Sequence, residues 1–292
     1  MLLIYGGSAD PQIRHFQNRV AARGLSYRAL LHGADNVSSL TWDLSTGRFH
    51  DDQGDITFSS AFVRQDVFRF LSSGDQRDRD DGASWKTMID GVLRADPSIR
   101  MFNRGFAGQA AVNKPLALLW AREAGLAIPD TVINASTSHA ETLLAEPTVY
   151  KPIVGGDMCR PLEAEALARV TTRDLKRPYI FQERLDAPEL RVFRVGGRFF
   201  GFDVAADALD YRSAGQDVVV TPKEVPEHLI APLRTLTDRI GLTYAAADFK
   251  YSSRDDKMKF LEVNSNPMFV GFDKSCDYEL VDAMIDHLTE PQ

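Results

Sequence analysis

The sequence is poor in three features that would each indicate a particular kind of protein. Two cysteines, Cys159 and Cys276, are too few for a disulfide framework, so reduced thiols are expected. Lys and Arg number 34 against 41 acidic residues, and the formal charge of −7 argues against a protein that coats nucleic acid. No run approaches the roughly 18 apolar residues of a membrane span, and the start of the chain lacks the basic residues of a signal peptide. The sequence therefore predicts a cytoplasmic protein with no nucleic-acid or membrane partner.

The composition is that of a globular protein with enough material for a core. Hydrophobic residues make up 44% and charged residues 26% of the 292 residues. At about 100–200 residues per domain, this length predicts two domains, or one domain with subdivisions. The six histidines are scattered without metal-ligand spacing, so we expect none of them to bind a metal.

The first hundred residues carry the alternating pattern of an α/β domain. Short apolar runs predict strands at Leu2–Tyr5, Tyr27–Leu31 and Ala61–Arg64. Between the first two strands, apolar residues at positions 13, 16 and 20 recur at helical spacing, and Gly24 can end that helix.

A polar stretch precedes a second predicted helix. Ser72–Gly82 is rich in Asp and Arg and is expected to form an exposed loop. Ser84 is the expected N-cap of the helix that follows. The apolar face of this helix has i, i+3, i+4, i+7 spacing: Trp85, Met88, Ile89 and Val92. Asp96-Pro97 closes the helix.

From about residue 100 the pattern changes to helices mixed with antiparallel hairpins, an α+β arrangement. Helices are predicted from Lys114 to a stop at Gly125, and over Leu162–Val170, Leu229–Ile240 and Glu279–Leu288. Strands are predicted at Thr148–Lys151, at Tyr179–Glu183 and in two hairpins, 191–195 with 198–204 and 244–251 with 258–263. Antiparallel sheets that face one another can enclose a ligand between them.

The second hairpin carries the sharpest chemical signal. Glu262 and Asn264 share a face because side chains alternate along a strand, and Asp248 on the partner strand can share that face. Two carboxylates about 4 Å apart repel by roughly 4 kcal/mol at an effective dielectric of 20. A shared proton or a divalent cation would relieve this repulsion, and oxygen ligands alone favour Mg²⁺. The alternative is a solvated strand face with ordinary surface acids.

Two lysines lie where a phosphate could bind. Lys114 begins a helix after Asn113, and Lys151 ends a strand just before Gly155-Gly156. Helix N-termini and glycine loops present backbone N–H groups, to which a lysine adds a positive charge. Either residue could equally be an ordinary surface lysine.

A third group follows the strand at 179–183. Gln182-Glu183-Arg184-Leu185 runs from a strand into an extended linker, whose backbone groups can pair with a flat heterocycle. Glu189 could accept hydrogen bonds from ribose hydroxyls, while Arg191 and Arg212 suit phosphate or carboxylate oxygens. The alternative is an edge strand followed by a charged loop.

The order of these motifs is more informative than any one of them. The series runs Asn113-Lys114-Pro115; Tyr150-Lys151-Pro152 with Gly155-Gly156; Gln182-Glu183-Arg184-Leu185 with Glu189 and Arg191; and Asp248 with Glu262-Val263-Asn264 and Asn266-Pro267. It resembles the ATP-grasp superfamily, and within it the RimK-type glutamate ligases and the graspetide macrocyclases. The resemblance covers roughly residues 100–270, and residues 1–100 share only the α/β character of a pre-ATP-grasp domain.

The resemblance implies a role for each matching position. Nucleotide binding falls to Lys114, Lys151, Gly155, Gly156, Gln182, Glu183, Leu185 and Glu189, with Glu183 and Leu185 meeting adenine through their backbone and Glu189 binding ribose. Mg²⁺, commonly two ions, falls to Asp248, Glu262 and Asn264, and the catalytic role of steadying a phosphorylated intermediate falls to Arg191 and Arg212. Met268-Phe269 stands where a glycine is common and is expected to shape the acceptor side of the site.

The resemblance also implies a fold and an activity. The expected fold is ATP-grasp, with a pre-ATP-grasp α/β domain over 1–100, a central subdomain over 101–181 and a C-terminal subdomain over 182–292, and with the nucleotide held between two antiparallel sheets. The expected activity is ATP-dependent ligation of a carboxylate to an amine, with an amino acid or peptide as substrate. A homo-oligomer is compatible with the resemblance.

Other activities stay open. They are peptide macrocyclisation, a non-catalytic nucleotide-binding regulator with the same fold, and a nicotinamide oxidoreductase. The last of these is disfavoured because Gly6-Gly7-Ser8 lacks the full glycine fingerprint.

Overall fold

The computed structural model describes residues 1–32, 39–65, 76–106, 112–134, 147–153, 159–163, 178–205 and 218–290. Several predicted features lie outside these ranges: most of the helix expected over Leu162–Val170, and Gly155, Gly156 and Arg212. No helix in the described part of the chain combines the length and the apolar character that crossing a membrane requires.

The N-terminal region is built on a parallel sheet with the strand order β2-β1-β6-β7. Its strands are β1 (Leu2–Gly7), β2 (Tyr27–His32), β6 (Ser60–Val63) and β7 (Arg100–Met101), and its helices are α1 (Pro11–Ala22) and α3 (Gln76–Ala95). Asp10 caps α1 by accepting from the Gln12 N–H at 2.8 Å. The α/β start predicted from the sequence is therefore confirmed.

The start of α3 differs from the prediction. The helix begins at Gln76, so Ser84 lies inside it rather than at its N-cap, and residues 76–82 are not a loop. The Ser84 hydroxyl donates to the Asp80 carbonyl one turn earlier at 2.7 Å. Residues 80, 81, 83 and 84 of the helix are exposed, which accounts for the polar composition there, and its buried apolar residues Ile89 and Leu93 lie in the second half.

A three-stranded antiparallel sheet that the sequence did not suggest follows β2. Its strands are β3 (Thr41–Asp43), β4 (Arg48–Asp51) and β5 (Gly54–Asp55). Phe49 of this sheet packs into the same apolar cluster as Leu3 and Tyr5 of β1 and Ile89 of α3. Strands this short carry too little alternation to be predicted from the sequence pattern.

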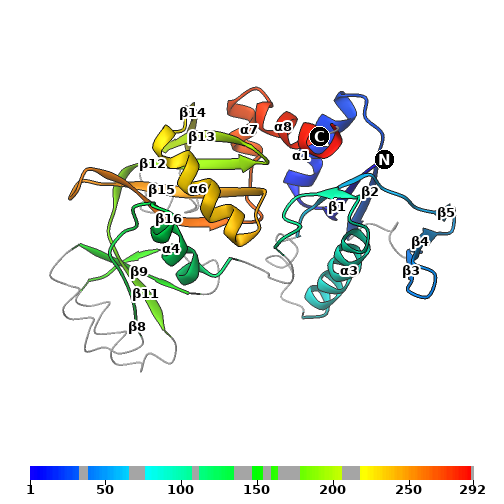
Figure 1. Cartoon of the computed structure of the whole chain (residues 1–292), viewed down its shortest axis with the longest axis horizontal. Coiled ribbons are helices and arrows are strands. Elements are labelled where there is room, and N and C mark those ends of the chain that lie inside the picture. Colours follow the sequence, from blue (N-terminus) through cyan, green and yellow to red (C-terminus); the bar gives the residue numbers. More distant parts are fainter. Residues whose placement is uncertain are drawn as a thin grey trace.

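Two antiparallel sheets form the rest of the molecule (Figure 1). The small sheet has the order β10-β9-β11-β8, with β8 (Thr131–Asn134), β9 (Thr148–Pro152), β10 (Arg160–Pro161) and β11 (Tyr179–Glu183). The large sheet has the order β14-β13-β12-β15-β16, with β12 (Asp186–Val195), β13 (Arg198–Ala205), β14 (Val219–Lys223), β15 (Tyr244–Ser252) and β16 (Lys257–Asn264). Both predicted hairpins are present, and strands β8, β10 and β14 are additions that the sequence did not suggest.

Helices cover both faces of the large sheet. On one face, α4 (Lys114–Glu123) and α6 (Glu227–Ile240) pack in a cluster with Val192, Phe249 and Phe260. On the other face, α7 (Val270–Ser275) and α8 (Glu279–Thr289) pack in a cluster that includes Phe193 and Phe202 and continues into the N-terminal sheet. Neighbouring residues such as Val192 and Phe193 enter opposite clusters because the side chains of a strand alternate.

The end of the chain returns to its beginning. Figure 1 shows α8 beside α1, and the Arg19 guanidinium of α1 contacts the Asp282 carboxylate of α8 at 2.5 Å. The N-terminal region and the large sheet therefore share one apolar core.

Candidate functional site

One cavity, of about 580 Å³, contains every predicted site residue that the structure describes. Those residues are Lys114, Lys151, Gln182, Glu183, Leu185, Glu189, Arg191, Asp248, Glu262 and Asn264. The small sheet contributes residues of β9 and β11, and the large sheet contributes residues of β12, β15 and β16. The cavity lies between two antiparallel sheets, as predicted.

The three predicted metal ligands lie together on the β15–β16 hairpin, Asp248 in the middle of β15 and the other two near the end of β16. Asp248 is paired with Glu262 across the two strands. The Asn264 amide nitrogen lies 3.3 Å from an Asp248 carboxylate oxygen and 3.4 Å from a Glu262 carboxylate oxygen. The alternative of an open, solvated strand face is wrong, since Asp248 is buried.

A shift in strand register places Glu262 in the cavity. Phe249 pairs with Phe260 while Asp248 pairs with Glu262, so Leu261 is left without a partner on β15. Phe260 can therefore pack in the core beside Phe249, while Glu262, two residues later, faces the cavity beside Asp248. Strict alternation would have put Phe260 and Glu262 on the same face.

The donor set fits a magnesium ion. Carboxylate and amide oxygens are the ligands that Mg²⁺ prefers. The described ranges hold no cluster of three or more His, Cys, Asp or Glu side chains suited to a metal, so a mixed carboxylate and amide set is the type of site they offer. Asp248, Glu262 and Asn264 form that set.

Basic side chains surround these acids. The Arg191 guanidinium lies 3.0 Å from Asp248 and over the rings of Phe193 and Phe272, at 5.4 Å and 5.2 Å from the ring centres. Lys114, at the N-terminus of α4, has its amine 3.6 Å from Glu262. Anions that enter the cavity would therefore meet cations from β12 and α4 beside the metal set.

The predicted nucleotide-base segment lies where the small sheet passes into the large one. Arg184 and Leu185 connect β11 to β12, and Leu185 lines the cavity. The Glu183 N–H donates to the Asp130 carbonyl at 2.9 Å, and the Arg184 N–H donates to the Pro147 carbonyl at 2.9 Å. These bonds fix the path of the connection.

Two charged residues of the cavity were not singled out as site residues from the sequence. Lys250 has its amine 3.1 Å from the carboxylate of Glu189, the expected ribose ligand. Its position two residues after Asp248, on the same face of β15, could have signalled its place.

Arg64 is the other, and it reaches the cavity from the N-terminal region. Its Nε donates to Asp10 at 2.7 Å and its Nη1 donates to the Pro267 carbonyl at 2.7 Å, while the buried Nη2 has no hydrogen-bond partner in the described structure. Arg64 follows β6 at the carboxyl end of the parallel sheet, the edge at which α/β sheets bind ligands.

The two bulky residues expected on the acceptor side separate in the structure. Met268 lines the cavity and is exposed, but Phe269 is fully buried and packs in the core. The Phe269 ring lies 6.3 Å from that of Phe62 in this core, and the Phe269 N–H donates to the Gln12 side-chain oxygen at 2.7 Å. The expectation for Phe269 was therefore wrong. Both cysteines are free thiols, and Cys159 lines the cavity.

No protein-family model matches the chain, and no curated protein sequence matches it. The structure is similar to that of the ATP-grasp ligase PsnB in complex with a phosphomimetic variant of a minimal precursor, Mg and ADP. The TM-score is 0.80 over 99% of this chain and 98% of that one, at 21% identity. The macrocyclase MdnC from Microcystis aeruginosa MRC, bound with its precursor peptide MdnA, gives a TM-score of 0.75 over 99% of each chain at 22% identity.

A ligase that acts on a different substrate shares the fold. The D-Ala:D-Ser ligase VanG from Enterococcus faecalis gives a TM-score of 0.64 over 99% of both chains at 12% identity. The chain therefore has the ATP-grasp fold that the order of its motifs over roughly residues 100–270 implied, and the structural match extends over 99% of the chain.

Proposed function

We propose that this protein is an ATP-dependent ligase that joins a carboxylate to an amine through an acyl phosphate. The observation that carries the proposal is that one cavity is lined by Asp248, Glu262 and Asn264 together with Lys151, Glu183 and Leu185. This arrangement would hold the triphosphate between the two sheets with its base against the connection. PsnB, with the same fold, binds Mg and ADP in its structure.

The reaction needs alignment and charge neutralisation rather than a protein nucleophile. A substrate carboxylate oxygen attacks the γ-phosphorus of ATP, the bond to ADP breaks, and an acyl phosphate forms. An amine then attacks the acyl carbon, loses a proton and expels phosphate. Mg²⁺ held by Asp248, Glu262 and Asn264 would supply positive charge to the phosphate oxygens.

The cationic side chains would contribute the rest of the charge. Lys114 and Lys151 would contact the phosphates, and Arg191 would steady the acyl phosphate, with Arg212 in the same role. The position of Arg191 over two aromatic rings holds its guanidinium in one orientation before substrate arrives. We assign the pre-ATP-grasp domain to 1–100 and the two halves of the grasp to 101–181 and 182–292.

A peptide is the substrate class that the comparisons favour. PsnB and MdnC, each solved with a precursor peptide, match with TM-scores of 0.80 and 0.75, against 0.64 for the D-Ala:D-Ser ligase. The specific candidate is therefore a macrocyclase that links two side chains of one peptide. A RimK-type addition of a free amino acid is the alternative.

The test is an ADP-release screen of amino acids and acidic peptides, followed by mass spectrometry. A macrocyclase leaves a product lighter than the peptide by one water for each bond formed, and an amino-acid ligase leaves a heavier one. Binding of ATP with Mg²⁺, but no ADP release with any carboxylate and amine pair, would instead favour a non-catalytic regulator.

A further inference from the structure

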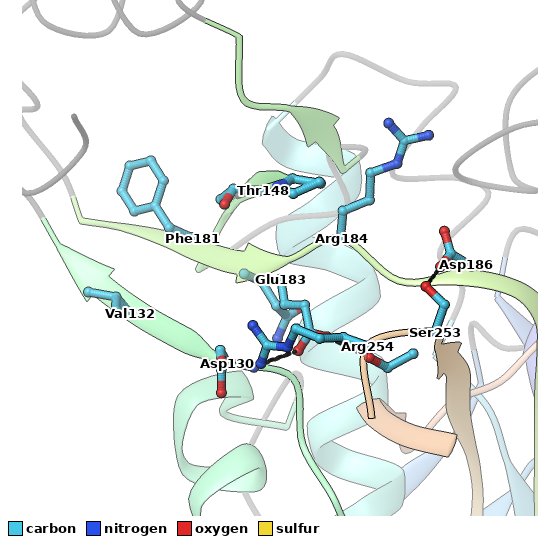
Figure 2. Close-up of a pocket in the computed structure, with 12 residues that line it drawn as sticks. Asp130, Val132, Thr148, Phe181, Glu183, Arg184, Asp186, Ser253 and Arg254 are labelled. Carbon is cyan, nitrogen blue, oxygen red and sulfur yellow. Dashed lines mark hydrogen bonds and ion pairs between the residues drawn. The ribbon is translucent and has the colours of Figure 1, made fainter. Parts of the chain in front are cut away.

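A second cavity, of about 500 Å³, is lined by residues of β11 and by residues 252–254 at the end of β15. It shares Gln182 and Glu183 with the first cavity. Figure 2 shows Glu183 on its wall, with Asp130 and Arg254 gathered on the same side. Glu183 is the last residue of β11, directly before the connection between the sheets, and its carboxylate takes part in a polar cluster.

The Glu183 carboxylate is held by three segments of the chain. The Lys259 amine of β16 donates to its oxygens at 2.8 Å and 3.1 Å. The Ser252 hydroxyl, at the end of β15, donates at 2.6 Å, and the Asp130 N–H, before β8, donates at 3.2 Å. These bonds join the connection to the far end of the β15–β16 hairpin.

Lys259 is charged and almost completely enclosed. Its side chain is 3% exposed and that of Glu183 is 9% exposed. Its other carboxylate contact is with Asp255, at 3.1 Å. Burial opposes the charge of both groups, but the hydrogen bonds of Lys259 to Glu183 and Asp255 raise the pKa of Lys259, and those of Glu183 to Lys259 and Ser252 lower the pKa of Glu183. A charged pair this enclosed needs close geometry to offset its desolvation.

The hairpin that holds Glu183 also carries the metal set. Asp248 lies on β15 and Glu262 on β16, each a few residues from the cluster. The ion pair between Glu183, in the nucleotide-base segment, and Lys259 therefore links the small sheet to the strands that carry the metal set.

We propose that Lys259 is a positioning residue that fixes the nucleotide-base segment, through the Glu183 carboxylate, relative to the strands of the metal site. The inference rests on the proposed function and deepens it. Lys259 would govern the affinity for the base and ribose of an adenine nucleotide while leaving the affinity for its phosphates unchanged.

The test compares two ligands on one set of variants, by calorimetry in the presence of Mg²⁺. The ligands are ADP and inorganic tripolyphosphate, which has no base. Lys259→Met removes the shorter ion pair of Glu183 with little change in side-chain length and leaves the Arg254 guanidinium 3.6 Å from the carboxylate. Lys259→Arg restores a donor of the same charge. Lys223→Met is the matched control, because Lys223 forms an exposed ion pair with Asp203 on the same sheet, at 2.8 Å.

We expect Lys259→Met to weaken ADP binding by about tenfold, a difference of about 1.4 kcal/mol, with no change for tripolyphosphate. Lys259→Arg should recover most of the ADP affinity, and Lys223→Met should change neither ligand. Ser252→Ala removes one hydrogen bond and leaves the ion pair, so it should show the same selectivity with a smaller loss, even if Lys259→Met fails to fold.

Two results would overturn the positioning role while leaving the proposed function intact. One is unchanged ADP affinity in Lys259→Met and Ser252→Ala, and the other is an equal loss for ADP and tripolyphosphate. Absence of ADP binding to the wild-type protein would overturn the proposed function and the positioning role with it.

Discussion

The two sheets that enclose the cavity are stabilised in different ways. The large sheet is packed on both faces, against α4 and α6 on one and against α7, α8 and the N-terminal region on the other. The buried cluster of the small sheet, within the described residues, consists of Leu162 and Phe181 with two partly buried tyrosines against it. Polar contacts to the large sheet supplement this small core, including those of the Glu183 carboxylate with the Lys259 amine at 2.8 Å and with the Ser252 hydroxyl at 2.6 Å.

This difference matches the chemistry assigned to each side. Ligands for a metal must be held within narrow distances, and the large sheet can do so because its strands cannot shift without disturbing two cores. The small sheet carries the lysine and leads into the connection to which we assign binding of the phosphates and of the base.

The largest expected effect comes from removing one charged group from each sheet. Glu262→Ala, on the large sheet, and Lys151→Ala, on the small one, should each reduce ADP release by about 100-fold or more. The first removes a proposed ligand of Mg²⁺, and the second removes a positive charge proposed to contact the phosphates. Circular dichroism should show that both variants remain folded. Unchanged turnover in both variants would remove the proposed mechanism.

Core truncations compare the stability of the two sheets directly. Phe249→Ala on the large sheet leaves Phe260 without its ring partner, 5.7 Å away, and should cost about 3–5 kcal/mol of unfolding free energy. Phe181→Ala on the small sheet should cost less in the global transition, because fewer apolar groups surround it among the described residues. Urea unfolding measures both. Equal losses would mean that the small sheet is as tightly integrated as the large one.

Two glycines follow helices that pack on the large sheet, and the space around them differs. Gly241 ends α6 at φ 89°, and a Cβ there would lie 2.6 Å from the Gly105 carbonyl carbon. Gly125, after α4, has φ 97° and nothing within 4 Å of an added Cβ. Gly125→Ala should cost about 1–2 kcal/mol for the left-handed conformation, and Gly241→Ala should add a further 1–3 kcal/mol, approximately, for the backbone clash.

Thermal unfolding of the two alanine variants provides the comparison. If both substitutions cost the same, the backbone at Gly105 and Gly241 relaxes freely, and α6 is less firmly docked than its burial indicates.

The smallest expected effect is a pH dependence at the junction of the large sheet and α8. Burial, together with the charges of Arg100 and Arg194, lowers the pKa of His287, whose ring stacks on Phe102. The unfolded chain therefore binds a proton at higher pH than the folded one, and stability should fall as the pH drops below the usual histidine value of about 6.5.

His287→Gln should flatten this part of the stability curve, measured by urea unfolding between about pH 5 and 8. His228→Gln, which replaces an exposed histidine of α6, is the control and should leave the slope unchanged. An unaltered slope in His287→Gln would show that other groups cause any acid destabilisation.

The sequence predicted the long elements and most of the site, for physical reasons that the molecule makes clear. Strands of six or more residues and capped helices such as α4 carry clear periodicity. Asp248, Glu262 and Asn264 were recognisable because alternation along a hairpin brings them to one face, and their neighbours in the chain are apolar.

Other features depend on contacts that are distant in the sequence. Arg64 enters the site through an interaction with Pro267, 203 residues away, and no local pattern encodes that. The expectation for Phe269 was wrong because the core that its ring enters is formed with residues far away in the sequence, such as Phe62. Gly155, Gly156 and Arg212 lie outside the described residues, so their roles stay predictions.

The most direct test of the central claim is the thermal unfolding of the wild-type protein and Glu262→Ala with and without ATP and Mg²⁺. A ligand at about 100 times its Kd adds about 2.7 kcal/mol to the stability of the folded state. The wild-type protein should therefore melt several degrees higher with millimolar ATP and Mg²⁺ together, and Glu262→Ala should lose most of that shift. No shift in the wild-type protein, or an equal shift in both, would contradict a magnesium nucleotide site between the two sheets.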